Sequence, residues 1–239
     1  RVVKYFEEFA KKINAPVIEN INVIEVTNDS KNNFFIKTSD GEYEAKNVIV
    51  ATGAFQVPVI PNIIPDHPHL EQLHSQFYKN PEQLKKGAVL VVGSGSSGSQ
   101  IAEELNRANK EVYFSIGPHD RPPRRYRGKD NVWWLGVLGK WEAKTPKPGT
   151  QHVTIAVSGY DGGKTIDFRK FAHSGITLLG MTKKYENGKL YFEDDLKTNI
   201  ENGDKNYLDL LDEADEYIKK NNLSFPEEPE ARNFLSDHS

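Results

Sequence analysis

The stretch VLVVGSGSSGSQIAEEL, residues 89–105, decides the fold that we predict for this chain. It opens with apolar residues typical of a buried strand, continues in glycine and serine alone, and ends in a sequence that favours a helix. The glycine-serine run matches G-x-G-x-x-G, in which each glycine has a physical role. Gly93 permits a tight turn, Gly95 lets a diphosphate approach the backbone, and Gly98 lets helix and strand pack closely. The stretch therefore predicts a dinucleotide site.

The residues on either side of this run agree with that prediction. Ile101, Leu105 and Ala108 give the expected helix an apolar stripe, and a second apolar strand is expected over 111–116. We therefore predict the α/β class, with a Rossmann-type parallel sheet and flanking helices. Unpaired amides at the helix start would bind the phosphates. The residues that we expect to hold the dinucleotide at this loop are Gly93, Ser94, Gly95, Ser96, Ser97 and Gly98.

The end of the second strand favours NADPH over NADH. An NAD site usually has an acidic residue there for the ribose 2′-hydroxyl, but residues 114–117 read Phe-Ser-Ile-Gly, with Ser115 at the position of interest. A basic loop over 119–130 follows, and guanidinium groups bind phosphate bidentately. We expect at least one of its arginines to reach the 2′-phosphate; the candidates are Arg121, Arg124, Arg125 and Arg127.

Composition narrows the class of protein further. The 239 residues carry a net charge of −3, which gives no general reason to expect nucleic acid or an anionic membrane as a partner. No apolar run approaches the ~20 residues of a membrane helix. Cysteine is absent, which excludes disulfides and thiolate metal sites and fits a cytoplasmic protein. We predict no metal site; a small-molecule substrate is expected but not identified, and a homo-oligomer stays open.

The first 60 residues have a different pattern from the glycine-rich region. Apolar residues at three- and four-residue steps predict a helix that ends before Pro16, and short apolar runs over 17–51 predict an antiparallel meander with a hairpin at Asp40-Gly41. Four prolines between 58 and 68 predict an irregular connector. We divide the chain into a helix and meander (1–60), a connector (61–86), a dinucleotide-binding domain (87–220) and a polar tail (221–239).

The second half predicts fewer regular elements. Apolar runs favour strands at 152–157, 177–181 and 190–192, the last two forming a hairpin around 186–188. Tyr207, Leu211, Ala214 and Ile218 predict a final amphipathic helix. The pair Trp133-Trp134 is expected to pack in a core.

Four stretches resemble the flavin-containing monooxygenase-like oxidoreductases, and within them the bacterial flavoproteins associated with cation transport. The stretches are VIVATGAFQVPVIP (48–61), LHSQFY (73–78), GAVLVVGSGSSGSQIAEEL (87–105) and RPPRRYRGKDNVWWLGVLG (121–139). The likeness extends from the opening helix to about residue 220.

The resemblance implies two dinucleotide folds, one for FAD and one for NADPH. It assigns the glycine loop to the NADPH fold, and it makes Ala51, Thr52 and Gly53 an ATG motif where the chain leaves the FAD domain. His74, Ser75 and Tyr78 match an HSxxY-like segment. In such enzymes NADPH passes hydride to FAD, and the cofactors carry the chemistry. We therefore expect no residue to act alone as catalytic acid, base or nucleophile.

One feature of the family is missing. Its members begin with a first G-x-G-x-x-G for FAD, and nothing like it precedes Val17. The meander is thus expected to be a partial FAD-domain remnant, and the FAD site incomplete. The functional hypothesis is the NADPH-binding portion of a flavin-dependent monooxygenase. The alternative is an isolated dinucleotide-binding module without turnover; a flavin-free NAD(P)-dependent dehydrogenase lacks a candidate acid–base group.

Overall fold

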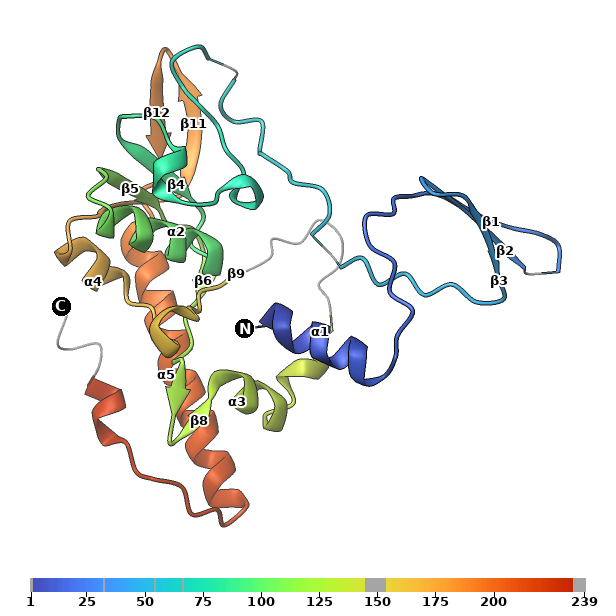
Figure 1. Cartoon of the computed structure of the whole chain (residues 1–239). Helices are drawn as coiled ribbons and strands as arrows, with labels where there is room; N and C mark the ends of the chain where they lie inside the picture. Colours follow the sequence, from blue (N-terminus) through green and yellow to red (C-terminus); the bar gives the residue numbers. More distant parts are fainter. Residues whose placement is uncertain (1, 32, 54, 66, 145–153, 234–239) are drawn as a thin grey trace. The chain divides into compact units, whose positions relative to one another are not determined.

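The computed structural model describes all residues except 1, 32, 54, 66, 145–153 and 234–239. The chain divides into two compact units, residues 1–57 and residues 58–239. Each unit is considered by itself below (Figure 1). No described helix is both long and apolar enough to cross a membrane.

The first unit contains one helix and one small sheet. Helix α1 covers Val2–Lys12, and strands β1 (Val23–Asn28), β2 (Phe34–Thr38) and β3 (Glu42–Ala45) form an antiparallel sheet in the order β1-β2-β3. The turn between β2 and β3 lies at Gly41, whose φ of 149° suits glycine, as the Asp-Gly pair predicted. The third strand is 42–45 and not the apolar run at 48–50, which is not a strand. None of the described residues of this unit is buried.

The second unit is built on a parallel sheet. Strands β4 (Val89–Val92), β5 (Val112–Ser115) and β10 (Thr177–Leu179) lie in the order β10-β5-β4, all parallel. Helix α2 (Ser96–Arg107) connects β4 to β5. A parallel sheet whose strands are joined by helices is the Rossmann-type α/β arrangement, so the predicted fold class is confirmed.

Side chains from the sheet and α2 form the main core. Ala102 and Leu105 of α2 are fully buried, and Phe114 of β5 packs its ring edge-to-face on Phe168. This burial fixes α2 on one face of the sheet and therefore sets where its first turn lies relative to the strand ends.

Several short elements connect the main ones. These are β6 (His119–Asp120), β7 (Arg125–Tyr126), β8 (Lys129–Asp130), α3 (Asn131–Val137), β9 (Thr154–Ile155), α4 (Phe168–His173) and the 3-10 turns Ser75–Phe77, Pro81–Gln83, Lys140–Glu142, Tyr160–Gly162 and Pro229–Asn233. Strand β9 pairs in parallel with β6 (Figure 1). The strand expected over 152–157 is therefore short, and its first two positions lie outside the described residues.

The predicted hairpin uses different strands from those expected. Strand β11 (Thr182–Glu186) pairs with β12 (Lys189–Phe192) through a turn at Asn187 and Gly188, which both have positive φ. The run at 177–179 instead joins the parallel sheet beside β5. The prediction failed here because the apolar run at 177–181 was assigned to the hairpin, whereas the more polar residues 182–186 form its first strand.

The last helix and the chain after it form a second core. Helix α5 (Leu196–Lys220) has 25 residues and begins well before the predicted Tyr207. Its buried face packs with Trp134, which is fully buried, as expected for this tryptophan pair. Phe225, in the segment expected to be a polar tail, packs edge-to-face on both Trp133 and Trp134. Over its described residues this segment is therefore part of the fold.

Candidate functional site

The glycine loop connects β4 to α2 at the carboxyl edge of the parallel sheet. Gly93 has a φ of 99°, a conformation that glycine adopts readily, and its amide donates to the carbonyl of Ser115 at 3.1 Å. A β-carbon on Gly98 would overlap the carbonyl oxygen of Gly93. The close approach between strand end and helix start thus requires glycine at position 98.

The first backbone amides of α2 have no side-chain cap. Gly95 is the N-cap residue and, having no side chain, offers no capping oxygen to the first helical amides. Such amides lack acceptors within the helix and lie at the positive end of its dipole, so together they favour an anion. Ser94 is buried, and its hydroxyl donates to Gly117 at 3.1 Å, which ties the loop to the residues after β5.

Ser96 and Ser97 differ in what their side chains do. The Ser96 hydroxyl donates to the carbonyl of Ile155 at 2.9 Å and accepts from the amide of Val157 at 3.2 Å. Ser97 is exposed and lines an open hollow of about 340 Å³ along α2, together with Tyr78. The Tyr78 hydroxyl donates to Glu104 of α2 at 2.8 Å, and burial raises the pKa of Tyr78.

The end of β5 has no carboxylate. Ser115 is buried; its hydroxyl donates to the carbonyl of Gly180 and accepts from the Thr182 hydroxyl, both at 2.9 Å. Its side chain is therefore engaged with β10–β11. His119 lies four residues further on, buried, and burial lowers the pKa of its imidazole. Its Nδ1 lies 2.9 Å from the carbonyl oxygen of Gly117.

Two of the candidate arginines are strongly engaged within the fold. Arg121 is buried; one terminal nitrogen donates to the carbonyl of Ile166 at 2.9 Å and the other pairs with Asp204. Arg124 forms a two-nitrogen pair with Asp130 at 3.1 and 3.0 Å, and its Nε is buried without a hydrogen-bond partner among the described residues.

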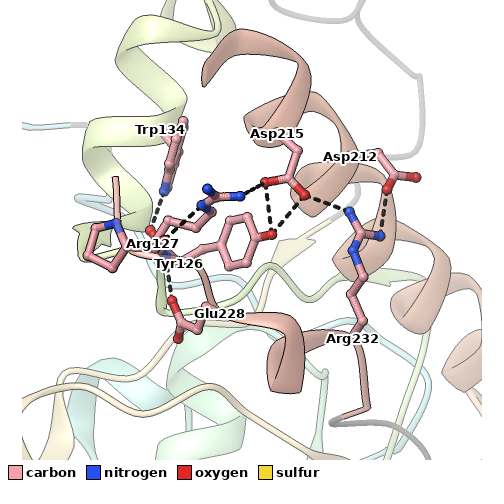
Figure 2. Close-up of polar contacts among 8 residues, drawn as sticks. Tyr126, Arg127, Trp134, Asp212, Asp215, Glu228 and Arg232 are labelled. Carbon is pink, nitrogen blue, oxygen red and sulfur yellow. Dashed lines mark hydrogen bonds and ion pairs between the residues drawn. The ribbon is translucent and has the colours of Figure 1, made fainter. Parts of the chain in front are cut away.

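The other two arginines of the basic loop differ in exposure. Arg125 is exposed and donates one hydrogen bond, to the carbonyl of Gly162 at 2.8 Å, so it keeps free donors. Arg127 belongs to a polar network on α5 (Figure 2), where it pairs with Asp215 at 2.7 Å.

Asp215 is the centre of that network. Its carboxylate accepts from the Tyr126 hydroxyl and pairs with Arg232 at 2.9 Å, while Arg232 also pairs with Asp212 at 2.6 Å (Figure 2). Burial opposes ionisation of Asp215, but the hydrogen bonds from Arg232, Tyr126 and Arg127 outweigh it and lower the pKa of this carboxyl. The network therefore joins the basic loop, α5 and the final segment.

Ala51, Thr52 and Gly53 lie in the first unit. All three are exposed; Gly53 has a φ of 79°, and the Gln56 side-chain amide donates to the carbonyl of Thr52. The second unit contains the glycine loop, so these two candidate regions belong to separately described units.

The structure also shows neighbours that the sequence did not indicate. Thr154 lies beside Gly95: a β-carbon on Gly95 would be 3.2 Å from Thr154 Cβ. Asp204, which pairs with Arg121, was missed as well. Neither residue belongs to a local motif, so no sequence signal pointed to it. Among the described residues, no group of three or more acidic or histidine side chains could hold a metal ion.

A parallel sheet with a glycine loop at its carboxyl edge defines this unit as a Rossmann-type α/β protein. The chain belongs to the pyridine nucleotide-disulphide oxidoreductase family, whose model matches residues 1–130. This confirms the resemblance to flavin monooxygenase-like oxidoreductases that the motifs indicated.

Individual relatives agree with this assignment. An uncharacterized CzcO-like oxidoreductase from Geobacillus kaustophilus is 40% identical over 140 residues, and the oxidoreductase CzcO from Bacillus subtilis is 41% identical over 148 residues. Each match covers 58% of this chain and 40% of the relative, so this chain spans less than half of those proteins. A solved flavin monooxygenase from Stenotrophomonas maltophilia has a similar fold, with a TM-score of 0.52 and 21% identity over 81% of this chain and 51% of that one.

Proposed function

We propose that this chain is the NADPH-binding portion of a flavin-dependent oxidoreductase of the monooxygenase-like class, and that it positions NADPH to reduce FAD. The observation that carries the proposal is the glycine loop: Gly98 is required by its contact with Gly93, and the first amides of α2 have no side-chain cap. Membership of the family supports the same function.

The residues of the loop would hold the diphosphate mainly through the backbone. Amides at Ser96, Ser97 and Gly98 would donate to phosphate oxygens, since the dipole of a 12-residue helix adds a favourable field. The hydroxyls of Ser94 and Ser96 are already bonded within the protein, so they would stiffen the loop. The dihydronicotinamide ring of NADPH, when bound, would supply the hydride.

Arg125 is the best candidate for the 2′-phosphate. Its guanidinium is exposed and has donors to spare, whereas Arg121, Arg124 and Arg127 pair with carboxylates. The absence of an acidic residue at the end of β5 removes the usual source of repulsion. The described residues contain one strand–glycine–helix unit, which we assign to NADPH and not to FAD. For the FAD domain we propose only that Ala51, Thr52 and Gly53 mark the point where the chain leaves it and the hinge begins.

Titration calorimetry with NADPH and NADH tests the proposal. We expect the chain to bind NADPH more tightly than NADH. Arg125→Ala should weaken the binding of NADPH about tenfold, since a charged hydrogen bond to the 2′-phosphate is lost, and should leave the affinity for NADH nearly unchanged. Arg107→Ala, an exposed arginine at the far end of α2, is the matched control and should affect neither. Equal wild-type affinities would remove the 2′-phosphate assignment, and no binding of either nucleotide would reject the function.

A binding module without turnover is the second candidate. It is favoured by the first unit, in which no described residue is buried, because a flavin is normally enclosed by protein. The absorbance spectrum of the purified chain separates the two. Flavin bands that bleach on adding NADPH in the absence of oxygen support the enzyme, and a colourless protein that binds NADPH supports the module.

A further inference from the structure

A short segment far along the chain lies against the first turn of α2. The Ser96 hydroxyl bonds both Ile155 and Val157, and the Gln100 side-chain amide donates to the carbonyl of Val157 at 3.3 Å. Thr154, the first described residue of this segment, packs against Gly95. The segment 154–157 therefore lies beside the first turn of the helix, from Gly95 to Gln100.

This segment is held in place on its other side as well. Ala156 is fully buried in the main core, and its amide donates to the carbonyl of Asp120 at 2.7 Å. Strand β9 pairs with β6, which in turn contacts α5. Because both sides of segment 154–157 are anchored, we infer that it is a fixed boundary of the space above the glycine loop and not a movable cover.

Thr154 places a hydroxyl at the edge of this boundary. A β-carbon on Gly95 would lie 3.4 Å from Thr154 Oγ1, so the hydroxyl is next to the N-cap residue of α2. The residue is exposed, and its hydroxyl has no hydrogen-bond partner among the residues that the structure describes. A threonine hydroxyl in such a position can donate to an oxygen of an anion held by the neighbouring amides.

We propose that Thr154 is a diphosphate-binding residue, forming the second wall of a site whose first wall is the start of α2. This inference rests on the proposed dinucleotide function and extends it to a residue 59 positions downstream of Gly95. The Ser96 hydroxyl holds this second wall in place through Ile155 and Val157.

The test compares two ligands on variants of the full chain. NADPH contains the diphosphate, whereas 2′-AMP contains the adenosine and 2′-phosphate without it. Thr154→Val keeps the shape of the side chain but removes its hydroxyl. It should weaken the binding of NADPH about tenfold and leave the affinity for 2′-AMP, measured by competition, unchanged. Thr154→Ser keeps the hydroxyl and should restore binding to within about twofold.

Thr177→Val is the matched control. Thr177 is an exposed threonine at the amino end of β10, the opposite edge of the sheet from the loop, and its variant should bind like the wild type. Wild-type binding of NADPH with an unaffected Thr154→Val variant would overturn the Thr154 assignment and leave the proposed function intact. Equal losses for NADPH and 2′-AMP would overturn it too, since the effect would then be structural. Failure of the wild type to bind NADPH would overturn both proposals.

Discussion

Gly98 and Gly203 are glycines inside helices, and each is required by a different neighbour. At Gly98 the neighbour is the carbonyl of Gly93, a rigid backbone atom. At Gly203 of α5 it is the imidazole of His119, whose Nε2 would lie 2.5 Å from an added β-carbon. The first contact follows from a local motif, and the second joins residues 84 positions apart.

We predict that Gly98→Ala destabilises the second unit and abolishes nucleotide binding. The backbone of β4 and α2 must separate to admit a methyl group, and such overpacking costs about 2 kcal/mol or more. Urea unfolding monitored by circular dichroism measures the change. Gly159→Ala, with open space around its β-carbon and φ of −96°, is the control and should change stability little. A stable Gly98→Ala variant would show that the strand and helix are not closely packed.

We predict that Gly203→Ala also destabilises the protein, by about 1–2 kcal/mol, although alanine is more favourable than glycine inside a helix by about 1 kcal/mol. The ring of His119 is buried, lies next to Gly203 and packs edge-to-face with Phe168, so it has little room to move. The same measurement in a His119→Ala background should reverse the sign, and Gly203→Ala should then stabilise. Equal effects in both backgrounds would mean that the two residues do not interact.

At the scale of elements, side-chain hydrogen bonds and ion pairs hold the final segment to α5 and to the basic loop. Arg127 donates to the Pro226 carbonyl at 2.9 Å, Tyr207 donates to Ala231 at 2.9 Å, and Arg232 bridges Asp212 and Asp215. Composition alone predicted a polar tail because the partners of these groups lie on other elements.

We predict that Asp215→Ala lowers the free energy of unfolding by about 1–2 kcal/mol. It leaves Arg127, Arg232 and the Tyr126 hydroxyl without their shared acceptor. The loss should exceed that of Asp209→Ala, because Asp209 pairs with Lys205 on the exposed side of the same helix and such pairs contribute at most about 0.5 kcal/mol. Chemical denaturation of both variants tests the difference; equal losses would mean that the network does not anchor the segment.

Elements were predicted best where their signal was local. Strand β4, the glycine loop and α2 are contiguous, and their order along the chain follows from periodicity and from the glycines between strand and helix. Strand β10 was assigned to the wrong partner because the sequence shows an apolar run but not the strand beside which it packs. The length of α5 was underestimated because its first turns bury Asn199 and Gly203, which do not look like core residues.

At the scale of the whole molecule, the two units differ in how much they bury. The second has two clusters of buried side chains, whereas the described residues of the first are all at least partly exposed. Folding stability comes mainly from apolar burial, so the units should not be equally stable.

We predict that residues 58–239 alone fold cooperatively and keep the affinity of the whole chain for NADPH, while residues 1–57 alone do not unfold cooperatively. Thermal melts followed by circular dichroism, together with the spread of amide proton shifts in NMR spectra, report on both pieces. A cooperative melt for 1–57 would contradict the expectation, as would loss of NADPH binding by 58–239.

The sequence by itself determined the class of this protein, because the strand, the glycine turn and the helix lie within 17 residues and each can be recognised from its own local pattern. Only the tertiary structure decided which polar groups meet. It paired Arg121 with Asp204 and Arg127 with Asp215, and it placed Thr154 beside Gly95. Those contacts join residues 59 to 88 positions apart, and packing of whole elements, rather than any local pattern, brings such residues together.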